Sequence, residues 1–184
     1  MRLGFTKTIS VLCAVFAVAM ACSPETDTTD AEASAEGITV YLVRHAERET
    51  GDDPDLNAAG QARAEALADA LEDAGLDTIW STDYRRTRAT SAPLAQRLEV
   101  DVQIYDPSDL DAFAETLKTA GETALVVGHS NTTPDLAAAL GGEAGPPIDE
   151  PTEYDRLYVL TGVGTATVET DIRRYGARND ASDG

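Results

Sequence analysis

The sequence is poor in cysteine, histidine, tryptophan and positive charge. Its 184 residues include two cysteines, two histidines and one tryptophan, and 33 acidic residues face 14 basic ones for a formal net charge of −19. This acidic excess argues against nucleic acid as a partner, because the phosphate backbone repels it. With so few thiols and imidazoles, a metal centre built from Cys and His is also poorly supported.

The N-terminus has the pattern of an export signal. Arg2 and Lys7 form a basic region, and residues 9–20 form an apolar run that is too short for a comfortable spanning helix. The following Ala-Met-Ala-Cys, residues 19–22, resembles the lipobox of bacterial lipoproteins, although Ala19 replaces the usual Leu. We therefore expect residues 1–21 to be a lipoprotein-type signal peptide and Cys22 to carry lipid. An ordinary secretory signal or a retained N-terminal anchor is the alternative.

A polar segment follows the proposed cleavage site. Residues 23–36, SPETDTTDAEASAE, contain no large apolar side chain, so residues 22–36 are predicted to form a disordered acidic tether. Cleavage would leave one cysteine and a formal charge of −21, which excludes a disulfide within the mature chain. Ser23 is not Asp, so the resemblance implies outer-membrane sorting in a Gram-negative cell, with the domain exported, membrane-anchored and facing the periplasm.

One folded domain is predicted at residues 37–178, with a disordered tail at 179–184. Apolar strands alternate with helical periodicities along this domain, which predicts a three-layer α/β/α sandwich with a mostly parallel sheet. Pro93 falls inside one helical pattern and predicts a kink or an early break. Strands are expected at 38–43, 77–80, 100–105, 123–127, 156–160 and 166–170, and helices at 58–74, 83–98, 109–119 and 134–140.

Both histidines and several arginines follow strands and precede helices. Arg44 and His45 end the first strand, an Arg85-Arg86 pair follows the second, and His129 ends the strand at 123–127. Ligands of open α/β sheets bind at the carboxyl ends of strands, so these side chains can converge. A neutral imidazole can take a phosphoryl group covalently, and guanidinium groups match phosphate oxygens. We expect a phosphoryl-transfer site, with a second, cationic histidine completing the clamp.

Four segments resemble the histidine phosphatase superfamily, whose fold is phosphoglycerate-mutase-like. They are LVRHAE, LNAAGQARAEAL, STDYRRTRATSAP and LVVGHSN, in the order and at the spacing of that family. Ala46 follows the first histidine where most members have Gly, as in small phosphohistidine-phosphatase-like members. Aligning Thr82 and Thr90 with the family's Ser and Thr places the family arginine at Arg86.

The resemblance implies a phosphatase whose nucleophile is His45, with Arg44, Arg86 and His129 as the phosphate pocket. It implies no cofactor and no metal, and the arginines would repel zinc, which two histidines could otherwise bind. We expect Arg48, Arg85 and Arg88 to be solvent-facing charges. The expected partners are a phosphorylated small molecule or phosphoprotein, and the membrane through the lipid anchor.

The general acid is unknown. Only 42 residues separate Arg86 from His129, which leaves no room for the long insertion that carries a Glu in mutase-like members. Glu47, Asp53 and Asp106 are candidates. Without an acid, a weakly basic leaving group such as the imidazole of phosphohistidine is favoured over an alkoxide. A catalytically weak phosphate- or phospholigand-binding lipoprotein on the same fold is the alternative function, and a mutase is a poorer one.

The lipobox resemblance makes a direct prediction for Cys22. Cys22→Ala should either move the protein from the membrane fraction toward the soluble fraction or leave it unprocessed. Cys13→Ala, inside the signal, is the matched control and should not change processing. A Cys22→Ala protein that fractionates and migrates like the wild type would contradict the lipid anchor.

Overall fold

A computed structural model describes residues 37–178. The predicted signal peptide, tether, lipidated Cys22 and C-terminal tail all lie outside the described residues. In the described part, no helix is both long and apolar enough to cross a membrane. The remaining chain forms alternating strands and helices, as the periodicities predict.

A six-stranded sheet forms the centre of the domain, in the order β3-β2-β4-β1-β5-β6. The pairs β1–β4, β2–β4 and β2–β3 are parallel, whereas β5 is antiparallel to both β1 and β6. The predicted mostly parallel sheet is confirmed. The strands are β1 (Ile38–Arg44), β2 (Thr78–Ser81), β3 (Val102–Ile104), β4 (Ala124–Gly128), β5 (Arg156–Val163) and β6 (Glu169–Arg174).

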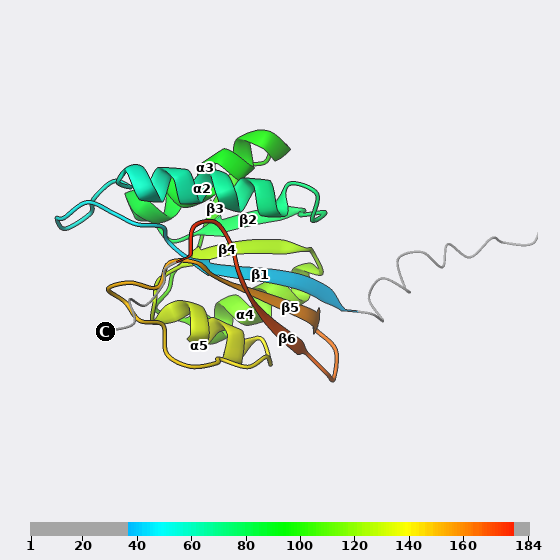
Figure 1. Ribbon diagram of the computed structural model, residues 1–184. Coiled ribbons are helices and arrows are strands. Elements are labelled where there is room, and N and C mark those ends of the chain that lie inside the picture. Colours follow the sequence, from blue (N-terminus) through cyan, green and yellow to red (C-terminus); the bar gives the residue numbers. More distant parts are fainter. Residues whose placement is uncertain (1–36, 179–184) are drawn as a thin grey trace, which may run out of the picture.

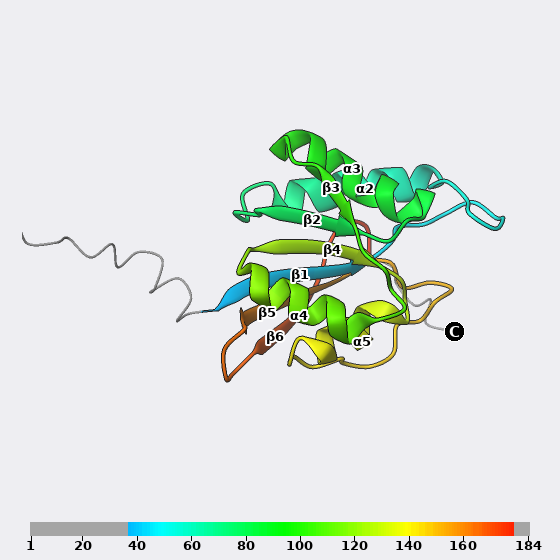
Figure 2. The ribbon, with the colours of Figure 1, turned by 180° about the vertical axis from the view of Figure 1, so that it is seen from behind.

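Helices cover both faces of the sheet, which confirms the three-layer sandwich (Figure 1). One layer holds α2 (Ala58–Leu71) and α3 (Arg85–Leu98), and the other holds α4 (Leu110–Ala120) and α5 (Thr132–Ala139), as the reverse view also shows (Figure 2). Each face has its own apolar core. Leu67 and Leu94 pack with β1 and β4 on one side, and Phe113 and Leu136 pack on the other.

Several predicted element ends are wrong. Pro93 does not break α3, which continues to Leu98 because Leu94 and Ala95 are buried in the core and that packing outweighs the lost hydrogen bond. The C-terminal hairpin is longer than predicted, since β5 reaches Val163 and β6 begins only at Glu169. Helix α2 ends at Leu71 rather than residue 74.

The register of the central strands brings the predicted motifs to one edge. Arg44 pairs with Gly128 across β1 and β4, and Ser81 pairs with Val127 across β2 and β4. The segments that follow these three strands therefore start side by side. Helix α2 also lies close to the first of them at Gly60, where an added Cβ would meet the Glu47 carbonyl at 1.9 Å.

Candidate active site

His45 directly follows β1 and is almost fully buried. Its main-chain N–H donates to the Gly128 carbonyl at 2.9 Å, which fixes its position against β4. Its ring Nδ1 lies 2.8 Å from the Ala46 carbonyl, which can only accept a hydrogen bond. Nδ1 therefore carries the proton, and the lone pair of the neutral ring lies on Nε2. The backbone thus selects the tautomer that a nucleophilic imidazole requires.

Arg44, the last residue of β1, is buried with an unusual set of partners. Its Nη1 donates to the carbonyl oxygens of Glu150 and Glu153, both at 2.9 Å, and its guanidinium carbon lies 4.1 Å from the centre of the Tyr154 ring. Its Nε and Nη2 are buried and have no protein partner. Burial lowers the pKa of Arg44, against the opposing effects of Tyr154 and Glu150, but arginine still stays charged. Buried charged donors without a partner cost free energy, and a bound anion would remove that cost by accepting their hydrogen bonds.

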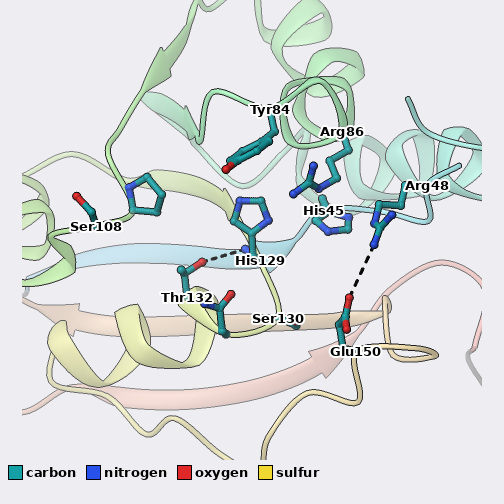
Figure 3. Close-up of a pocket in the computed structure, with 11 residues that line it drawn as sticks. His45, Arg48, Tyr84, Arg86, Ser108, His129, Ser130, Thr132 and Glu150 are labelled. Atoms are coloured by element: carbon teal, nitrogen blue, oxygen red, sulfur yellow. Dashed lines mark hydrogen bonds and ion pairs between the residues drawn. The ribbon is translucent and has the colours of Figure 1, made fainter. Parts of the chain in front are cut away.

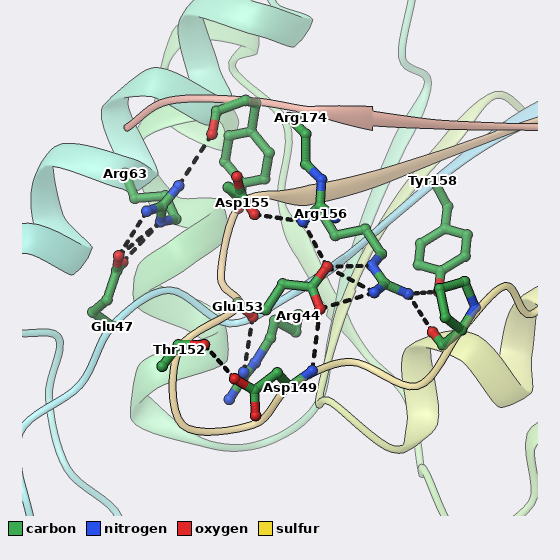
Figure 4. Close-up of polar contacts among 12 residues, drawn as sticks. Arg44, Glu47, Arg63, Asp149, Thr152, Glu153, Asp155, Arg156, Tyr158 and Arg174 are labelled. Carbon is green, nitrogen blue, oxygen red and sulfur yellow. Dashed lines mark hydrogen bonds and ion pairs between the residues drawn. The ribbon is translucent and has the colours of Figure 1, made fainter. Parts of the chain in front are cut away.

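The segment that holds Arg44 is itself fixed by a buried ion-pair network (Figure 4). Arg156 at the start of β5 donates Nε and Nη2 to the Glu153 carboxylate at 2.7 and 2.8 Å. Glu153 also accepts from the Asp149 N–H and from Arg174. Burial alone would raise the pKa of Glu153, but these hydrogen bonds hold it below its usual value. The carbonyls that receive Arg44 are therefore rigidly placed.

Arg86 lies in the first turn of α3, and it is the member of the Arg85-Arg86 pair that lines the pocket. Its Nε is buried without a partner, and its Nη1 lies 3.6 Å from Asp53 Oδ1. Its guanidinium carbon lies 4.4 Å from the centre of the Tyr84 ring. Arg85, in contrast, is half exposed and pairs with Asp55. The alignment that chose Arg86 over Arg85 agrees with this placement.

His129 follows β4, and its ring centre lies 5.5 Å from that of His45. Its Nε2 is 3.0 Å from the Thr82 hydroxyl, which donates to the Thr87 hydroxyl. The Thr87 hydroxyl uses its own proton to donate to main-chain carbonyls, so it accepts the proton of Thr82. The Thr82 hydroxyl oxygen can therefore accept a hydrogen bond from His129 Nε2–H. The main-chain N–H of His129 donates to the hydroxyl of Thr132 at the start of α5. Both histidine rings are thus oriented by the ends of neighbouring strands.

Both imidazoles are neutral in the ligand-free pocket. Burial lowers the pKa of His45 to about 3 despite the hydrogen bond to Ala46, and the charges of Arg44 and Arg86 add to the effect. Burial and the same two arginines lower the pKa of His129 to about 4. The cationic second histidine of the expected phosphate clamp therefore requires a bound anion. A bound dianion would raise its pKa.

His45, Arg86 and His129 line an open pocket of about 530 Å³ (Figure 3). Arg44, which is 1% exposed, is not part of the pocket wall. Arg48 is part of the wall and lies 3.9 Å from the Glu150 carboxylate, so the expectation that Arg48 faces only solvent is wrong. Arg88, as expected, is exposed and pairs with Asp83. The lining residues are His45, Arg48, Tyr84, Arg86, Pro107, Ser108, His129, Ser130, Asn131, Thr132 and Glu150.

None of the three candidate acids lines this pocket. Glu47 is held by two hydrogen bonds from Arg63 Nε and one from its Nη2. Asp53 accepts from the main-chain N–H of Arg85 and lies beside Arg86. Hydrogen bonds from Ser108 lower the pKa of Asp106, which favours its ionised form. Among the described residues that line the pocket, Glu150 alone carries a carboxylate, and its side chain is 62% exposed.

Sequence reasoning missed Tyr84, Glu150 and Tyr154, and also Pro107 and Ser108 of the pocket wall. Tyr154 and Glu150 lie in the Gly/Pro-rich segment before β5, which contains no motif and which folds back over Arg44 through long-range contacts. Tyr84 lies inside the quoted STDYRRTR segment, two residues before Arg86, but its aromatic character carries no signal of its own in that motif. No group of three or more His, Cys, Asp or Glu side chains able to hold a metal occurs within residues 37–178.

Comparison with known proteins agrees with the fold. Residues 40–107, which include both arginines and His45, match the model of the histidine phosphatase superfamily (branch 1). No curated protein sequence is significantly similar to the chain.

Solved structures share the architecture at low sequence identity. A structure named as the phosphohistidine phosphatase SixA of Agrobacterium tumefaciens has a TM-score of 0.58 at 22% identity, covering 77% of this chain and 99% of its own. The protein histidine phosphatase SixA in complex with tungstate has a TM-score of 0.57 at 15% identity, covering 76% and 97%. A mycobacterial glucosyl-3-phosphoglycerate phosphatase has a TM-score of 0.54 at 14% identity, covering 77% and 100%.

These comparisons give the fold and one segment. Residues 40–107 match the histidine phosphatase superfamily model, and the domain has the phosphoglycerate-mutase-like fold of the solved phosphatases.

The depressed pKa values predict an unusual titration. The chain has two histidines, so their ring signals can be followed individually by NMR. Neither ring should titrate between pH 5 and 8, and saturating vanadate should raise the pKa of His129. Because the unfolded chain takes up these protons near pH 6.5 and the native chain does not, the free energy of unfolding should fall as pH drops from 6.5 toward 4. A midpoint near 6.5 for both rings would contradict the buried, arginine-flanked site.

Proposed function

We propose that the chain is an exported, membrane-tethered and metal-independent phosphatase that hydrolyses a phosphomonoester or a phosphohistidine through a phosphohistidine intermediate on His45. One observation carries the proposal. A neutral imidazole whose free lone pair lies on Nε2 stands beside buried guanidinium donors of Arg44 and Arg86 that have no protein partner. A phosphoryl group is the ligand that uses both features at once.

The reaction proceeds in two displacements. Arg44 and Arg86 bind the non-bridging oxygens, and His45 Nε2 attacks phosphorus, forming the P–N bond as the bond to the leaving group breaks. The leaving group departs with its electron pair and takes up a proton. Water then attacks the phosphohistidine, which releases inorganic phosphate and restores neutral His45. His129, held through Nε2 by Thr82, becomes a donor to a phosphoryl oxygen when its Nδ1 takes up a proton, which the bound dianion favours.

Leaving-group chemistry narrows the substrate. The Glu150 side chain is largely exposed and lies 3.9 Å from Arg48, so no contact in the described residues fixes it as a general acid toward a leaving group. A phosphohistidine releases an imidazole and needs little protonation, whereas an alkyl phosphate releases a strongly basic alkoxide. Two of the similar structures are named as a phosphohistidine phosphatase and a protein histidine phosphatase, which supports the same direction.

A second phosphate on the substrate is disfavoured. A neighbouring cavity of about 370 Å³ shares Pro107, Ser108, Asn131 and Thr132 with the pocket, and its wall includes Asp109, Asp111 and Asp135. Carboxylates repel a second anionic group. This argues against a bisphosphate-dependent mutase and favours a substrate with one phosphoryl group.

The test is to trap the intermediate. The full chain, incubated with labelled phosphohistidine or aryl phosphate and quenched in alkali, should carry an acid-labile, base-stable label on the peptide that contains His45. His45→Ala should lower turnover on the order of 10³-fold or more without changing the circular dichroism spectrum. Turnover should persist in EDTA.

Two outcomes would contradict the proposal. The first is a label on Ser, Asp or Cys22 with turnover intact. The second is tight binding of phosphate or vanadate with no turnover of any substrate, which would instead support the phospholigand-binding lipoprotein.

A further inference from the structure

Tyr84 presents an exposed aromatic ring to the pocket. In the described residues, Tyr84 and Ile104 are the exposed large hydrophobic side chains, with 39% and 47% of their surfaces accessible. Ile104 does not line the pocket, whereas Tyr84 does. An aromatic ring left open at a polar pocket has apolar surface that a ligand can cover.

The Tyr84 ring is fixed in place before any ligand arrives. Its ring centre lies 4.4 Å from the guanidinium carbon of Arg86 and 5.1 Å from the centre of the His129 ring, at an interplanar angle of 89°. Its main-chain N–H donates to the Thr82 carbonyl at 2.9 Å. Cation–π and edge-to-face contacts of this kind hold a ring with little remaining freedom. Binding of a group that stacks on the ring therefore costs little free energy for ordering the Tyr84 side chain.

A leaving group can reach the ring across the pocket, because Tyr84 and His45 both line it. In-line displacement places the leaving group on the side of phosphorus opposite His45 Nε2. In Figure 3 the hydroxyl end of Tyr84 points away from Arg86 toward the part of the pocket where Ser108 lies, while Arg48 and Glu150 lie on the other side. The pocket wall also includes the uncharged Pro107, Ser108 and Thr132, which it shares with the neighbouring acidic cavity.

We propose that Tyr84 is a specificity residue that stacks on planar leaving groups, such as the imidazole of phosphohistidine or a phenol ring. This rests on the proposed phosphatase function and adds a binding contribution that is separate from leaving-group basicity. The competing interpretation is that Tyr84 only orients Arg86, in which case every substrate would depend on it equally.

The experiment compares two substrates with leaving groups of similar acidity but different shape. Phenyl phosphate has a planar leaving group, and hexafluoroisopropyl phosphate has a compact one that is not planar. In the full chain, Tyr84→Leu should lower the ratio of kcat/KM for the planar over the non-planar substrate by about three- to tenfold, the range measured for aromatic pairs. Tyr84→Phe, which keeps the ring, should leave that ratio within about twofold of wild type.

The ratio separates stacking from indirect effects. A change that acts through Arg86 lowers both rates together and leaves the ratio unchanged. That result in Tyr84→Leu, and in Tyr84→Met as a second variant of different shape, would overturn the specificity role while the phosphatase function stands. Failure of the wild type to hydrolyse phenyl phosphate while it turns over phosphohistidine would overturn stacking on a phenol ring and leave the proposed function standing. Failure on every substrate, phosphohistidine included, would overturn both.

Discussion

The site depends on the way in which Arg44 is held. Arg44 Nη1 donates hydrogen bonds to the main-chain carbonyls of Glu150 and Glu153, and the Tyr154 ring packs against the guanidinium group. The Nε and Nη2 donors of Arg44 stay buried and have no partner. Such an arrangement costs free energy in the absence of an anion and persists because the surrounding fold enforces it. Pairing of β1 with β4 fixes the backbone position of Arg44. The Glu153–Arg156 ion pair holds the segment whose carbonyls accept hydrogen bonds from Arg44.

The same arginines set the protonation of the histidines. In a chain with a formal net charge of −19, Arg44 and Arg86 form a local cationic focus within a low-dielectric pocket. Burial and these charges keep His45 unprotonated, and the Ala46 carbonyl directs its lone pair to Nε2. Anion binding and nucleophile activation therefore have one physical origin. A bound phosphoryl group partly neutralises the arginines and makes a proton on His129 more favourable.

The fold and the central residues could be predicted from the sequence because their signals are local. Apolar strands that alternate with helical periods fix the sandwich, and residues directly after parallel strands must share one edge. Boundaries were less accurate where tertiary packing overrides local preference, as at Pro93, where buried Leu94 and Ala95 keep α3 intact.

The residues that were missed have no local signal. Tyr154 and Glu150 belong to the site only because their segment folds back over β1, 106 or more residues away along the chain. Whether Arg48 faces the pocket or solvent depends on that same segment, since its partner there is Glu150. The protonation of His129 could not be read from the sequence either, because it follows from burial between two arginines.

The most direct test of the account is a crystal structure of the protein with vanadate. We expect vanadium bonded to His45 Nε2, with vanadate oxygens accepting hydrogen bonds from Arg44 Nη2 and Arg86 Nε, and with Arg44 Nη1 still on the carbonyls of Glu150 and Glu153. Vanadate bound away from His45, or bound while Arg44 has left these carbonyls, would contradict the account.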